Sequence, residues 1–392
     1  MNTKLFDKEV QDFIHNNLST DLSALILKGS PFAELTIQEL AQQIEGHQKA
    51  VKKLPLWHQT AHIVFPKKIN LEQTSSEATA LYKTNLIRGN SLIDLTGGFG
   101  IDCTYFSRKI KEVVHCELNS ELSKIVTHNT EVFGIDNLKT LQGDSLEILK
   151  SNAHKFDWIY IDPSRRNDAK GKVFLLKDCL PNVPENLDVI FEYTDNILIK
   201  NSPFLDITST IRELKHVKEI HIVAVQNDVK ELLFILEKGY SNTIAIKTSN
   251  IGKRTSQEFN FDLGSHELAE YSEPKVYLYE PNAAILKSGA FHQIATKLKI
   301  AKLQQHTHLY TSEKLLENFP GRIFKIEQTI PYNKKELAKL LPEKKANITI
   351  RNFPETVAQI RKKSKIKDGG TTYLFFTTNL HHKLLVLLCS KI

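Results

Sequence analysis

The feature that most constrains this sequence lies between residues 91 and 166, where short apolar runs alternate with polar turns. The run Ser91–Leu95 breaks into a glycine-rich turn, Thr96–Gly100, and an amphipathic segment follows at Ile101–Ile110. This order predicts a strand, a glycine turn and a helix. Glycines at such a turn let the backbone approach a ligand closely and adopt dihedral angles that a Cβ atom would forbid.

Three further apolar runs have acidic residues at or just beyond their carboxyl ends. They are Val113–Glu117, Leu138–Gln142 before Gly143-Asp144-Ser145, and Phe156–Ile161 before Asp162. Parallel strands of an open α/β sheet end at one edge, and ligands bind at that edge. We therefore expect Glu117 to accept hydrogen bonds from a ribose diol and Asp144 to lie near an adenine amino group.

The glycine turn has three possible interpretations: a dinucleotide-binding turn, an S-adenosylmethionine-binding turn, and a turn without a ligand. A dinucleotide-binding turn needs G-x-G-x-x-G, and Cys103 occupies the place of its third glycine. An S-adenosylmethionine site has an acid four residues before a G-x-G, and Asp94, Gly98 and Gly100 fit that spacing. We favour S-adenosylmethionine and hence a methyltransferase. The predicted cofactor-binding residues are Asp94, Thr96, Gly97, Gly98, Gly100, Glu117, Asp144, Ser145 and Asp162.

The predicted acceptor segment is the sequence DPSRR that begins at Asp162. Methyl transfer needs mainly an acceptor placed in line with the methyl group. Asp162 and the carbonyl groups around Pro163 would accept hydrogen bonds from an exocyclic amine, and arginines suit phosphate binding or base stacking. The alternative is a structural ion pair between Asp162 and Arg165. The predicted catalytic residues are Asp162, Pro163, Ser164 and Arg165, and the predicted substrate-binding residues are Arg165, Arg166 and Lys200.

Composition narrows the class of protein. A chain of 392 residues is too long for one ordinary core and indicates about two to four domains. Its 41% hydrophobic and 25% charged residues are typical of soluble globular proteins. The four cysteines lack C-x-x-C spacing, the amino terminus lacks a signal-like apolar region, and Leu384–Cys389 is too short to span a bilayer. We expect a cytoplasmic protein that has no metal and no membrane partner.

Positive charge is concentrated at the carboxyl end. Residues 321–392 contain fifteen Lys and Arg against five Asp and Glu, a net charge of +10, although the whole chain carries only +7. Such asymmetry indicates binding to a polyanion, and the alternative is a Lys-rich solvated surface. We predict that this basic region binds RNA.

The predicted fold class is α/β, a Rossmann-like seven-stranded methyltransferase sheet with a helical amino-terminal extension and a small α+β carboxyl-terminal domain. The predicted domains are a helical extension at 1–88, the methyltransferase domain at 89–265, a small linking α/β segment at 266–320 and the basic domain at 321–392.

Several elements are expected within these domains. The amino-terminal extension contains helices, one of them opened by a capping box of Thr36 and Glu39. Thr74, Ser75 or Ser76 caps the helix before the first strand, or contacts the methionine end of the cofactor. In the sheet region, Ile197–Lys200 is favoured over Val189–Tyr193 as the fifth strand, helices are expected at Phe174–Leu180 and Val229–Glu237, and a hairpin closes the domain at 243–263. Further on, Ser288 or Gly289 begins a helix.

The motifs DLTGGFG at 94–100, Glu117, GDS at 143–145 and DPSRR at 162–166 resemble those of class I S-adenosylmethionine-dependent methyltransferases. The layout is similar to trimethylguanosine synthase, which has a helical amino-terminal extension and a tetrad of D/N/S, two prolines and an aromatic residue. Here Ser164 stands at the second proline and Arg165 at the aromatic position. The chain also resembles an uncharacterised bacterial family with a THUMP-like carboxyl-terminal domain, and residues 351–376 carry that likeness. THUMP domains bind RNA.

These observations define the functional hypotheses. The first is an S-adenosylmethionine-dependent methyltransferase acting on tRNA or rRNA, with guanine N2 as the candidate atom. The second is a methyltransferase that acts on a protein or a small molecule. The third is a non-catalytic RNA-binding module, and a nicotinamide-dependent enzyme is the most distant alternative.

Overall fold

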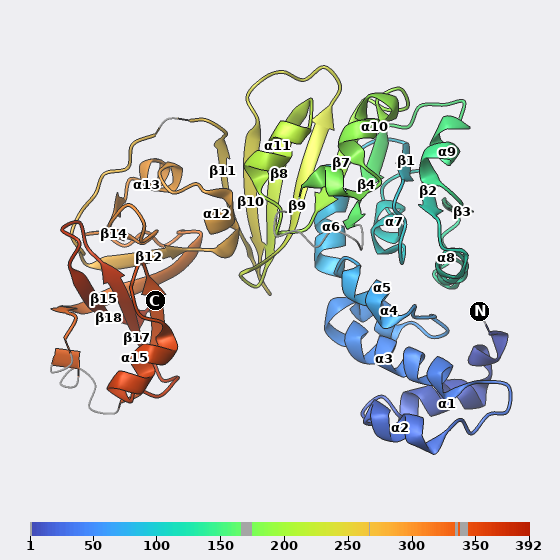
Figure 1. Cartoon of the computed structure of the whole chain (residues 1–392), viewed down its shortest axis with the longest axis horizontal. Coiled ribbons are helices and arrows are strands. Elements are labelled where there is room, and N and C mark those ends of the chain that lie inside the picture. The colour runs from blue at the N-terminus through green and yellow to red at the C-terminus, as the bar shows by residue number, and fades with distance from the viewer. Residues whose placement is uncertain (1, 166–174, 266, 334–335, 338–343) are drawn as a thin grey trace. The chain divides into compact units, whose positions relative to one another are not determined.

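The structure is a computed structural model that describes residues 2–165, 175–265, 267–333, 336–337 and 344–392. The chain forms two compact units (Figure 1). Unit 1 contains residues 1–219 and 230–242, and unit 2 contains residues 220–229 and 243–392. Each unit has hydrophobic core clusters of its own.

Unit 1 begins with the expected helices, which are coloured blue in Figure 1. The helices are η1 (Thr3–Phe6), α1 (Lys8–Asn16), α2 (Leu22–Lys28), α3 (Ile37–Lys53), α4 (Pro55–Gln59), α5 (Lys68–Gln73) and α6 (Glu77–Leu86). The predicted capping box opens α3, since Glu39 N donates to Thr36 Oγ1 at 3.2 Å and Thr36 N donates to Glu39 Oε2 at 2.8 Å. Val10, Ile14 and Leu40 contribute to the buried core between these helices.

The strands of unit 1 lie in the order β3-β2-β1-β4-β7-β9. They are β1 (Ser91–Asp94), β2 (Glu112–Glu117), β3 (Leu138–Gln142), β4 (Trp158–Ile161), β7 (Asn196–Asn201) and β9 (Asp228–Glu237). The first five are mutually parallel, whereas β9 runs antiparallel to β7. The parallel strands therefore end at one edge of the sheet, as predicted.

Short helices and turns connect these strands. The helices are α7 (Ile101–Phe106), α8 (Ser120–Val132), α9 (Ser145–Lys150), α10 (Val183–Ile190) and α11 (Ile207–Glu213), together with the 3-10 turn η2 (Leu176–Asp178). Two short strands, β5 (Ser164–Arg165) and β6 (Cys179–Leu180), pair with each other. Nonpolar residues of α7 and α8, such as Ile101 and Leu122, join the core cluster around Trp57.

Two expected helices of this region are wrong. The segment predicted as the helix Val229–Glu237 lies in strand β9, because the five consecutive apolar residues 232–236 are all buried. A short, fully buried apolar run has no periodicity that separates a strand from a helix. The segment Phe174–Leu180 contains η2 and β6, and its first residue lies outside the described residues. The fifth parallel strand is β7, which confirms the choice of Ile197–Lys200, whereas Val189–Tyr193 begins inside α10.

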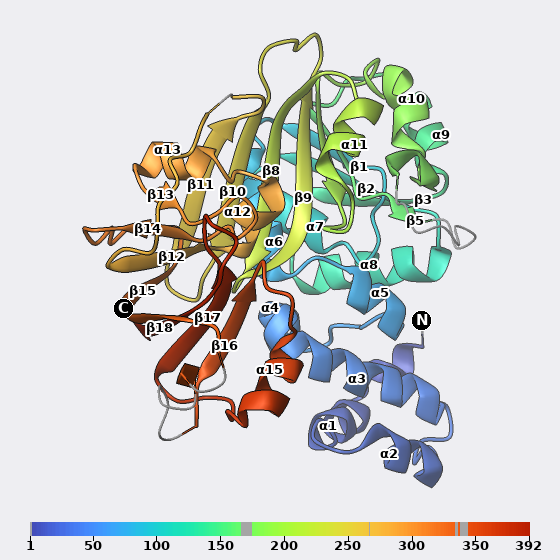
Figure 2. The ribbon, with the colours of Figure 1, turned by 60° about the vertical axis from the view of Figure 1, so that its left-hand side comes forward.

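Unit 2 contains most of β8 (Val217–Val225) and the hairpin of β10 (Ala245–Ile251) and β11 (Ser256–Asp262). This hairpin confirms the prediction for residues 243–263. A second sheet has the order β13-β14-β12-β15-β18-β17-β16, and its strands β15, β18 and β17 lie side by side in Figure 2. The bounds are β12 (Tyr277–Pro281), β13 (Ala301–Lys302), β14 (Tyr310–Ser312), β15 (Gly321–Pro331), β16 (Asn347–Arg351), β17 (Thr372–Thr378) and β18 (Leu384–Lys391).

The helices of unit 2 include α12 (Ala283–Ser288), α13 (Gln293–Leu298) and α15 (Val357–Ser364). The expectation that Ser288 or Gly289 begins a helix is wrong. Asn282 caps the start of α12, and Gly289 ends that helix in the left-handed conformation with φ +75°. Glycine favours this role because it adopts positive φ without a steric cost. Among the described residues, no helix combines the length and the apolar composition needed to cross a membrane.

Candidate active site

The glycine turn after β1 packs directly on the end of β2. Gly97 N donates to Cys116 O at 2.8 Å, and a Cβ atom on Gly97 would lie 2.3 Å from His115 Nε2. Gly98 and Gly100 have φ of +57° and +73°. The turn therefore needs glycine at 97 for space and at 98 and 100 for conformation.

Asp94 organises the start of this turn from the end of β1. Its Oδ1 accepts hydrogen bonds from Thr96 N at 2.8 Å and Thr96 Oγ1 at 3.0 Å, while Cys103 Sγ donates to Oδ2 at 3.2 Å. Asp94 is 1% exposed, and this burial raises its pKa to about 7. Cys103, which stands where a dinucleotide-binding turn has its third glycine, thus contacts the acid of the turn.

Glu117 lies at the end of β2 and faces the glycine turn. Its Oε2 accepts from Gly98 N at 2.9 Å, and its Oε1 accepts from Asn119 N at 2.7 Å. The side chain is half-buried. The structure therefore brings Glu117 and the turn together, as the sequence predicted.

Asp144 caps the helix that follows β3. Its Oδ1 accepts from Leu146 N at 2.9 Å and from Glu147 N at 3.1 Å, and Ser145 is the first residue of α9. Gly143 N donates to Glu117 O at 3.0 Å, which ties this loop to the end of β2. Asp144 is exposed beside the predicted cofactor edge.

Asp162 follows β4 and is joined to both the glycine turn and β7. Its backbone N–H donates to Thr96 Oγ1 at 2.6 Å, and Lys200 Nζ donates to its Oδ2. The Asp162 side chain is 33% exposed and that of Lys200 is 10% exposed. The structure thus shows Lys200 in an ion pair with Asp162, and the alternative pair with Arg165 stays a prediction. Pro163 follows in the chain, and the side chain of Arg165 and all of Arg166 lie outside what the structure describes.

The electrostatics of this pair differ for its two members. Burial raises the pKa of Asp162, although Lys200 acts in the opposite direction. Burial alone would lower the pKa of Lys200, but Asp162, Glu231 and Asp102 together hold it well above its usual value. Lys200 is therefore a fixed cation at neutral pH.

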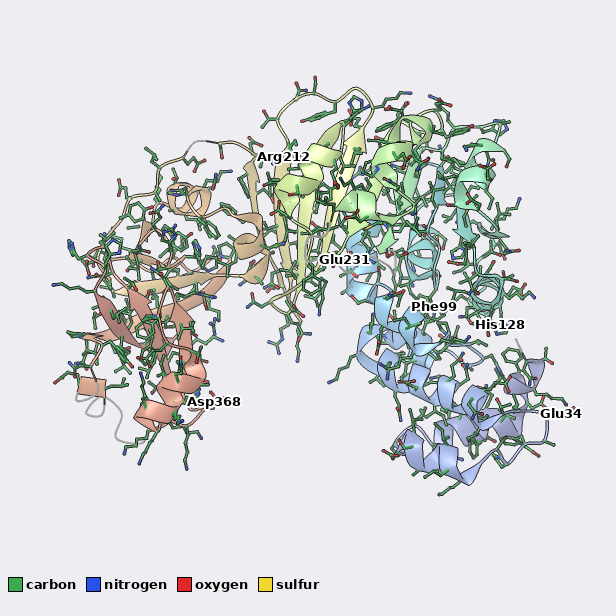
Figure 3. The ribbon with its side chains drawn as sticks, viewed as in Figure 1. Glu34, Phe99, His128, Arg212, Glu231 and Asp368 are labelled. Atoms are coloured by element: carbon green, nitrogen blue, oxygen red, sulfur yellow. The ribbon has the colours of Figure 1, made fainter. Side chains whose placement is uncertain are left out.

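A buried charge cluster that the sequence analysis missed lies behind this pair. Lys83 of α6 is 0% exposed, and its Nζ lies 2.6 Å from Glu231 Oε2 and 3.2 Å from Asp102 Oδ1. Figure 3 shows Glu231 beside the ribbon of α6. The signal in the sequence was a charged residue beside apolar ones, since Glu231 directly precedes the run 232–236.

Ser75 and Tyr160 complete the charge cluster. Lys83 Nζ donates to Ser75 Oγ at 3.0 Å, and Asp102 Oδ2 accepts from Ser75 Oγ at 2.8 Å and Tyr160 OH at 2.7 Å. Burial acts to raise the pKa of Asp102, but Lys83 and Lys200 outweigh it and lower this pKa. Of the three candidates for the helix cap, Ser76 caps α6, so Ser75 is free to enter the cluster.

The basic region shows exposed lysines around the end of α15. Ile360 and Ile366 anchor this segment in the core, while Lys362, Lys365 and Lys367 are exposed. Positive side chains near the last turn of a helix also interact favourably with its dipole. Within the part of the chain that the structure describes, no group of three or more His, Cys, Asp or Glu could hold a metal ion.

Family profiles match three parts of the chain. Residues 79–226 match the family described as "conserved hypothetical protein 95", residues 277–320 match a ferredoxin-like domain, and residues 321–391 match a THUMP domain-like family. Comparison with curated proteins gives no match.

Solved structures show similarity over the whole chain and over its methyltransferase part. The crystal structure of a "putative methyltransferase" from Porphyromonas gingivalis W83 is 31% identical, covers 98% of each chain and has a TM-score of 0.87. An rRNA methylase from Streptococcus thermophilus is 14% identical and covers 41% of this chain and 94% of its own, with a TM-score of 0.30. The O-methyltransferase from Bacillus cereus in complex with SAH is 14% identical and covers 47% of this chain and 98% of its own, with a TM-score of 0.34.

The parallel sheet, the glycine turn and the acids at the strand ends define a Rossmann-like methyltransferase. The chain belongs to the same family as the Porphyromonas gingivalis methyltransferase, which it matches over nearly its full length. The predicted fold class, the resemblance and the assignment as a methyltransferase are thereby confirmed.

Proposed function

We propose that this protein transfers a methyl group from S-adenosylmethionine to RNA, with tRNA or rRNA as the substrate. The observation that carries the proposal is the contact of Asp162 N with Thr96 Oγ1 at 2.6 Å. This hydrogen bond fixes the candidate acceptor residue against the glycine turn. A cofactor in the turn would therefore present its methyl group next to Asp162, as in-line transfer requires.

S-adenosylmethionine occupies the edge formed by β1, β2 and β3. The glycine turn at 97–100 lets the cofactor approach the backbone closely. Glu117 accepts hydrogen bonds from the ribose hydroxyls of the cofactor, and Asp144 and Ser145 lie beside its adenine. Asp94 shapes the turn through Thr96. The positively charged sulfonium suits a site whose strand ends supply several carboxylates.

RNA docks on the THUMP-like region. Two observations support RNA docking at this region. Residues 321–392 carry a net charge of +10, and Lys362, Lys365 and Lys367 are exposed around α15. Binding to phosphates releases counterions, so the affinity for RNA falls steeply as salt rises. The sequence also predicts Arg165 and Arg166 as substrate-binding residues, and this prediction lies outside what the structure describes.

Guanine N2 is the candidate acceptor atom from the sequence. Asp162 and the carbonyl groups around Pro163 offer hydrogen-bond acceptors to an exocyclic amine. The ion pair of Asp162 with Lys200 adds a donor to the same place.

The experiment uses purified protein, methyl-labelled S-adenosylmethionine and an extract of cells that lack the protein. The products are digested separately with ribonuclease and with protease. Label released by ribonuclease supports RNA methylation, whereas label in protein or in small molecules supports the second hypothesis. No transfer and no binding of S-adenosylmethionine would support the non-catalytic RNA-binding module.

A matched pair of variants tests the docking surface. Replacing Lys362, Lys365 and Lys367 together by Ala should raise the KM for RNA and flatten its dependence on salt. Replacing the exposed Lys4, Lys68 and Lys215 of unit 1 by Ala removes the same charge elsewhere and should leave both unchanged. Equal effects of the two triple variants would contradict docking through α15.

A further inference from the structure

The ion pair of Asp162 and Lys200 is the exposed end of a larger set of charges. Lys200 is in direct contact with Asp162. The carboxylates of Glu231 and Asp102, which lie deeper in unit 1, also raise the pKa of Lys200. Lys83 in turn neutralises those two carboxylates at 2.6 Å and 3.2 Å. The charges come from α6, α7, the end of β4, β7 and β9, so the whole of unit 1 fixes the position of the pair.

Burying such charges has a cost, which makes their arrangement informative. Each buried ion loses several kcal/mol of hydration, and a nonpolar replacement often serves stability equally well. The charge cluster of Lys83, Asp102 and Glu231 ends at a carboxylate that is one-third exposed and beside the predicted methyl group. Its arrangement suits a chemical step at Asp162 better than a purely structural role.

The ion pair offers a substrate one hydrogen-bond acceptor, the carboxylate of Asp162, and one donor, the ammonium of Lys200, which are in contact with each other. An exocyclic amine brings N–H donors, and its lone pair must face the methyl group, so an ammonium beside it finds no acceptor. A hydroxyl brings one donor and two lone pairs. It can donate to Asp162, accept from Lys200 and still direct a lone pair at the methyl group.

The sequence after Asp162 also suits a hydroxyl on the RNA backbone. Methylating a base requires the base to leave its stack and to be held by stacking on side chains. The next three residues are Pro163, Ser164 and Arg165, so no aromatic ring directly follows Asp162 and only a guanidinium is offered for stacking on a base. A ribose 2′-hydroxyl is reached without unstacking, and contacts to the neighbouring phosphates position it.

We propose that the methyl acceptor is the ribose 2′-hydroxyl of RNA, bound between the carboxylate of Asp162 and the ammonium of Lys200. This inference rests on the proposed function as an RNA methyltransferase. In the transfer, the hydroxyl oxygen forms a bond to the methyl carbon as the carbon–sulfur bond breaks, and the electron pair of that bond stays on sulfur. The hydroxyl proton passes to Asp162 and then to water, while Lys200 stabilises the negative charge that develops on oxygen.

Lys83, Asp102 and Glu231 are positioning residues in this mechanism. They touch neither substrate nor cofactor. Asp102 and Glu231 act by keeping Lys200 protonated, and Lys83 holds these two carboxylates in place. Glu231→Gln removes one carboxylate behind Lys200 and therefore lowers the pKa of its ammonium. Glu231→Gln should lower kcat with little change in the KM for S-adenosylmethionine, and Glu231→Asp, which restores the charge, should recover part of kcat.

The first experiment maps the acceptor atom with the unmodified full chain. Total RNA from cells that lack the protein is methylated with labelled S-adenosylmethionine and hydrolysed in alkali. A 2′-O-methyl group blocks alkaline cleavage at its own phosphodiester, so the proposal expects the label in dinucleotides. Label in mononucleotides means a methylated base, which overturns the hydroxyl acceptor but leaves RNA methylation standing. Absence of label from RNA overturns the proposed function itself, and the hydroxyl acceptor with it.

The second experiment tests Lys200 with a matched control. Lys200→Met should lower kcat by on the order of 10²–10³-fold with little change in the KM for S-adenosylmethionine. The control Lys215→Met removes a lysine that is ion-paired with Asp188 at 3.0 Å but exposed, and its kcat should stay that of the unmodified protein. A Lys200→Met variant that keeps its fold by circular dichroism and also keeps full kcat would overturn the role of Lys200.

Discussion

Thr96 Oγ1 accepts the backbone N–H of Asp162 at 2.6 Å and so ties the first strand of the sheet to the fourth. The same oxygen donates to Asp94 Oδ1 at 3.0 Å. One hydroxyl thus fixes the glycine turn, where the cofactor is proposed to bind, and the residue where the acceptor is proposed to bind. The placement of the two proposed binding sites therefore depends in part on this side chain.

Thr96→Val keeps the shape of this side chain and removes its hydroxyl. We expect a loss of about 1–3 kcal/mol in the free energy of unfolding, because the partly buried N–H of Asp162 and the buried carboxylate of Asp94 each lose a hydrogen-bond partner. The kcat should fall more than this loss of stability explains, since the acceptor site is no longer fixed to the turn. Thr96→Ser restores the hydroxyl and should recover most of the activity. Chemical denaturation and steady-state kinetics of both variants measure these effects.

Gly97→Ala should abolish binding of S-adenosylmethionine or unfold the turn. The added Cβ atom would lie 2.3 Å from His115 Nε2 and 2.7 Å from Cys116 O, and the backbone oxygen cannot move without breaking β2. Gly134→Ala is the control, because no atom lies within 4 Å of its added Cβ and only its φ of +64° is unfavourable. That control should cost about 1 kcal/mol in stability and leave cofactor affinity intact. Isothermal titration with S-adenosylmethionine separates the two variants.

The buried Asp94 should make stability depend on pH. Its pKa is raised from 3.8 to about 7, so between these values the folded chain holds a proton that the unfolded chain has lost. The free energy of unfolding therefore falls as the pH rises through this window. Asp162 has a raised pKa and adds a change of the same sign. Urea denaturation at pH 5 and at pH 8 measures the difference.

Asp94→Asn identifies the contribution of this one residue. The amide does not ionise, so the difference in stability between pH 5 and pH 8 should shrink by roughly 2–3 kcal/mol. Affinity for S-adenosylmethionine should lose part of its pH dependence as well, because a cationic ligand favours the ionised acid. If the free energy of unfolding of Asp94→Asn depends on pH as strongly as that of the unmodified protein, then other groups cause the pH dependence.

The contact of Lys83 with Glu231 should be worth far more than an exposed ion pair. Lys83→Met leaves two buried carboxylates without their cation, and we expect a loss of about 3–5 kcal/mol in the free energy of unfolding. Combining Lys83→Met with Glu231→Gln should recover part of this loss, since one of the stranded charges is gone. Breaking the exposed pair of Lys215 and Asp188 should cost about 0–1 kcal/mol. Thermal unfolding of these three variants tests this order.

Much of the fold follows from local pattern. The strands at 91, 113 and 138 start and end within one residue of their predicted bounds, because apolar runs that stop at glycines and acids leave little choice. The acids at these strand ends also lie where the sequence placed them. The prediction of a helix at 229–237 was wrong because its apolar residues are consecutive and all buried. Such a run has no periodicity that separates a strand from a helix.

The charge contacts around the candidate site depend on folding and have no local signal. Lys83 and Glu231 are 148 residues apart in the chain, yet they lie in direct contact. Asp162 pairs with Lys200 across two neighbouring strands, and nothing in the sequence around Asp162 indicates this partner. Which of several possible partners a charge finds is decided by sheet order, and one sequence does not reveal that order in advance.

Glu117 has a consequence for the rate at which cofactor is exchanged. Both of its carboxylate oxygens already accept backbone N–H groups, those of Gly98 and Asn119. The carboxylate is therefore already held in place by the chain, and each oxygen keeps a lone pair free for the ribose hydroxyl that we propose it binds. Little conformational entropy is lost when the ribose binds, and little rearrangement is needed when the spent nucleoside departs. For the proposed methyl transfer to RNA, we therefore expect that reloading of the methyl donor does not limit turnover.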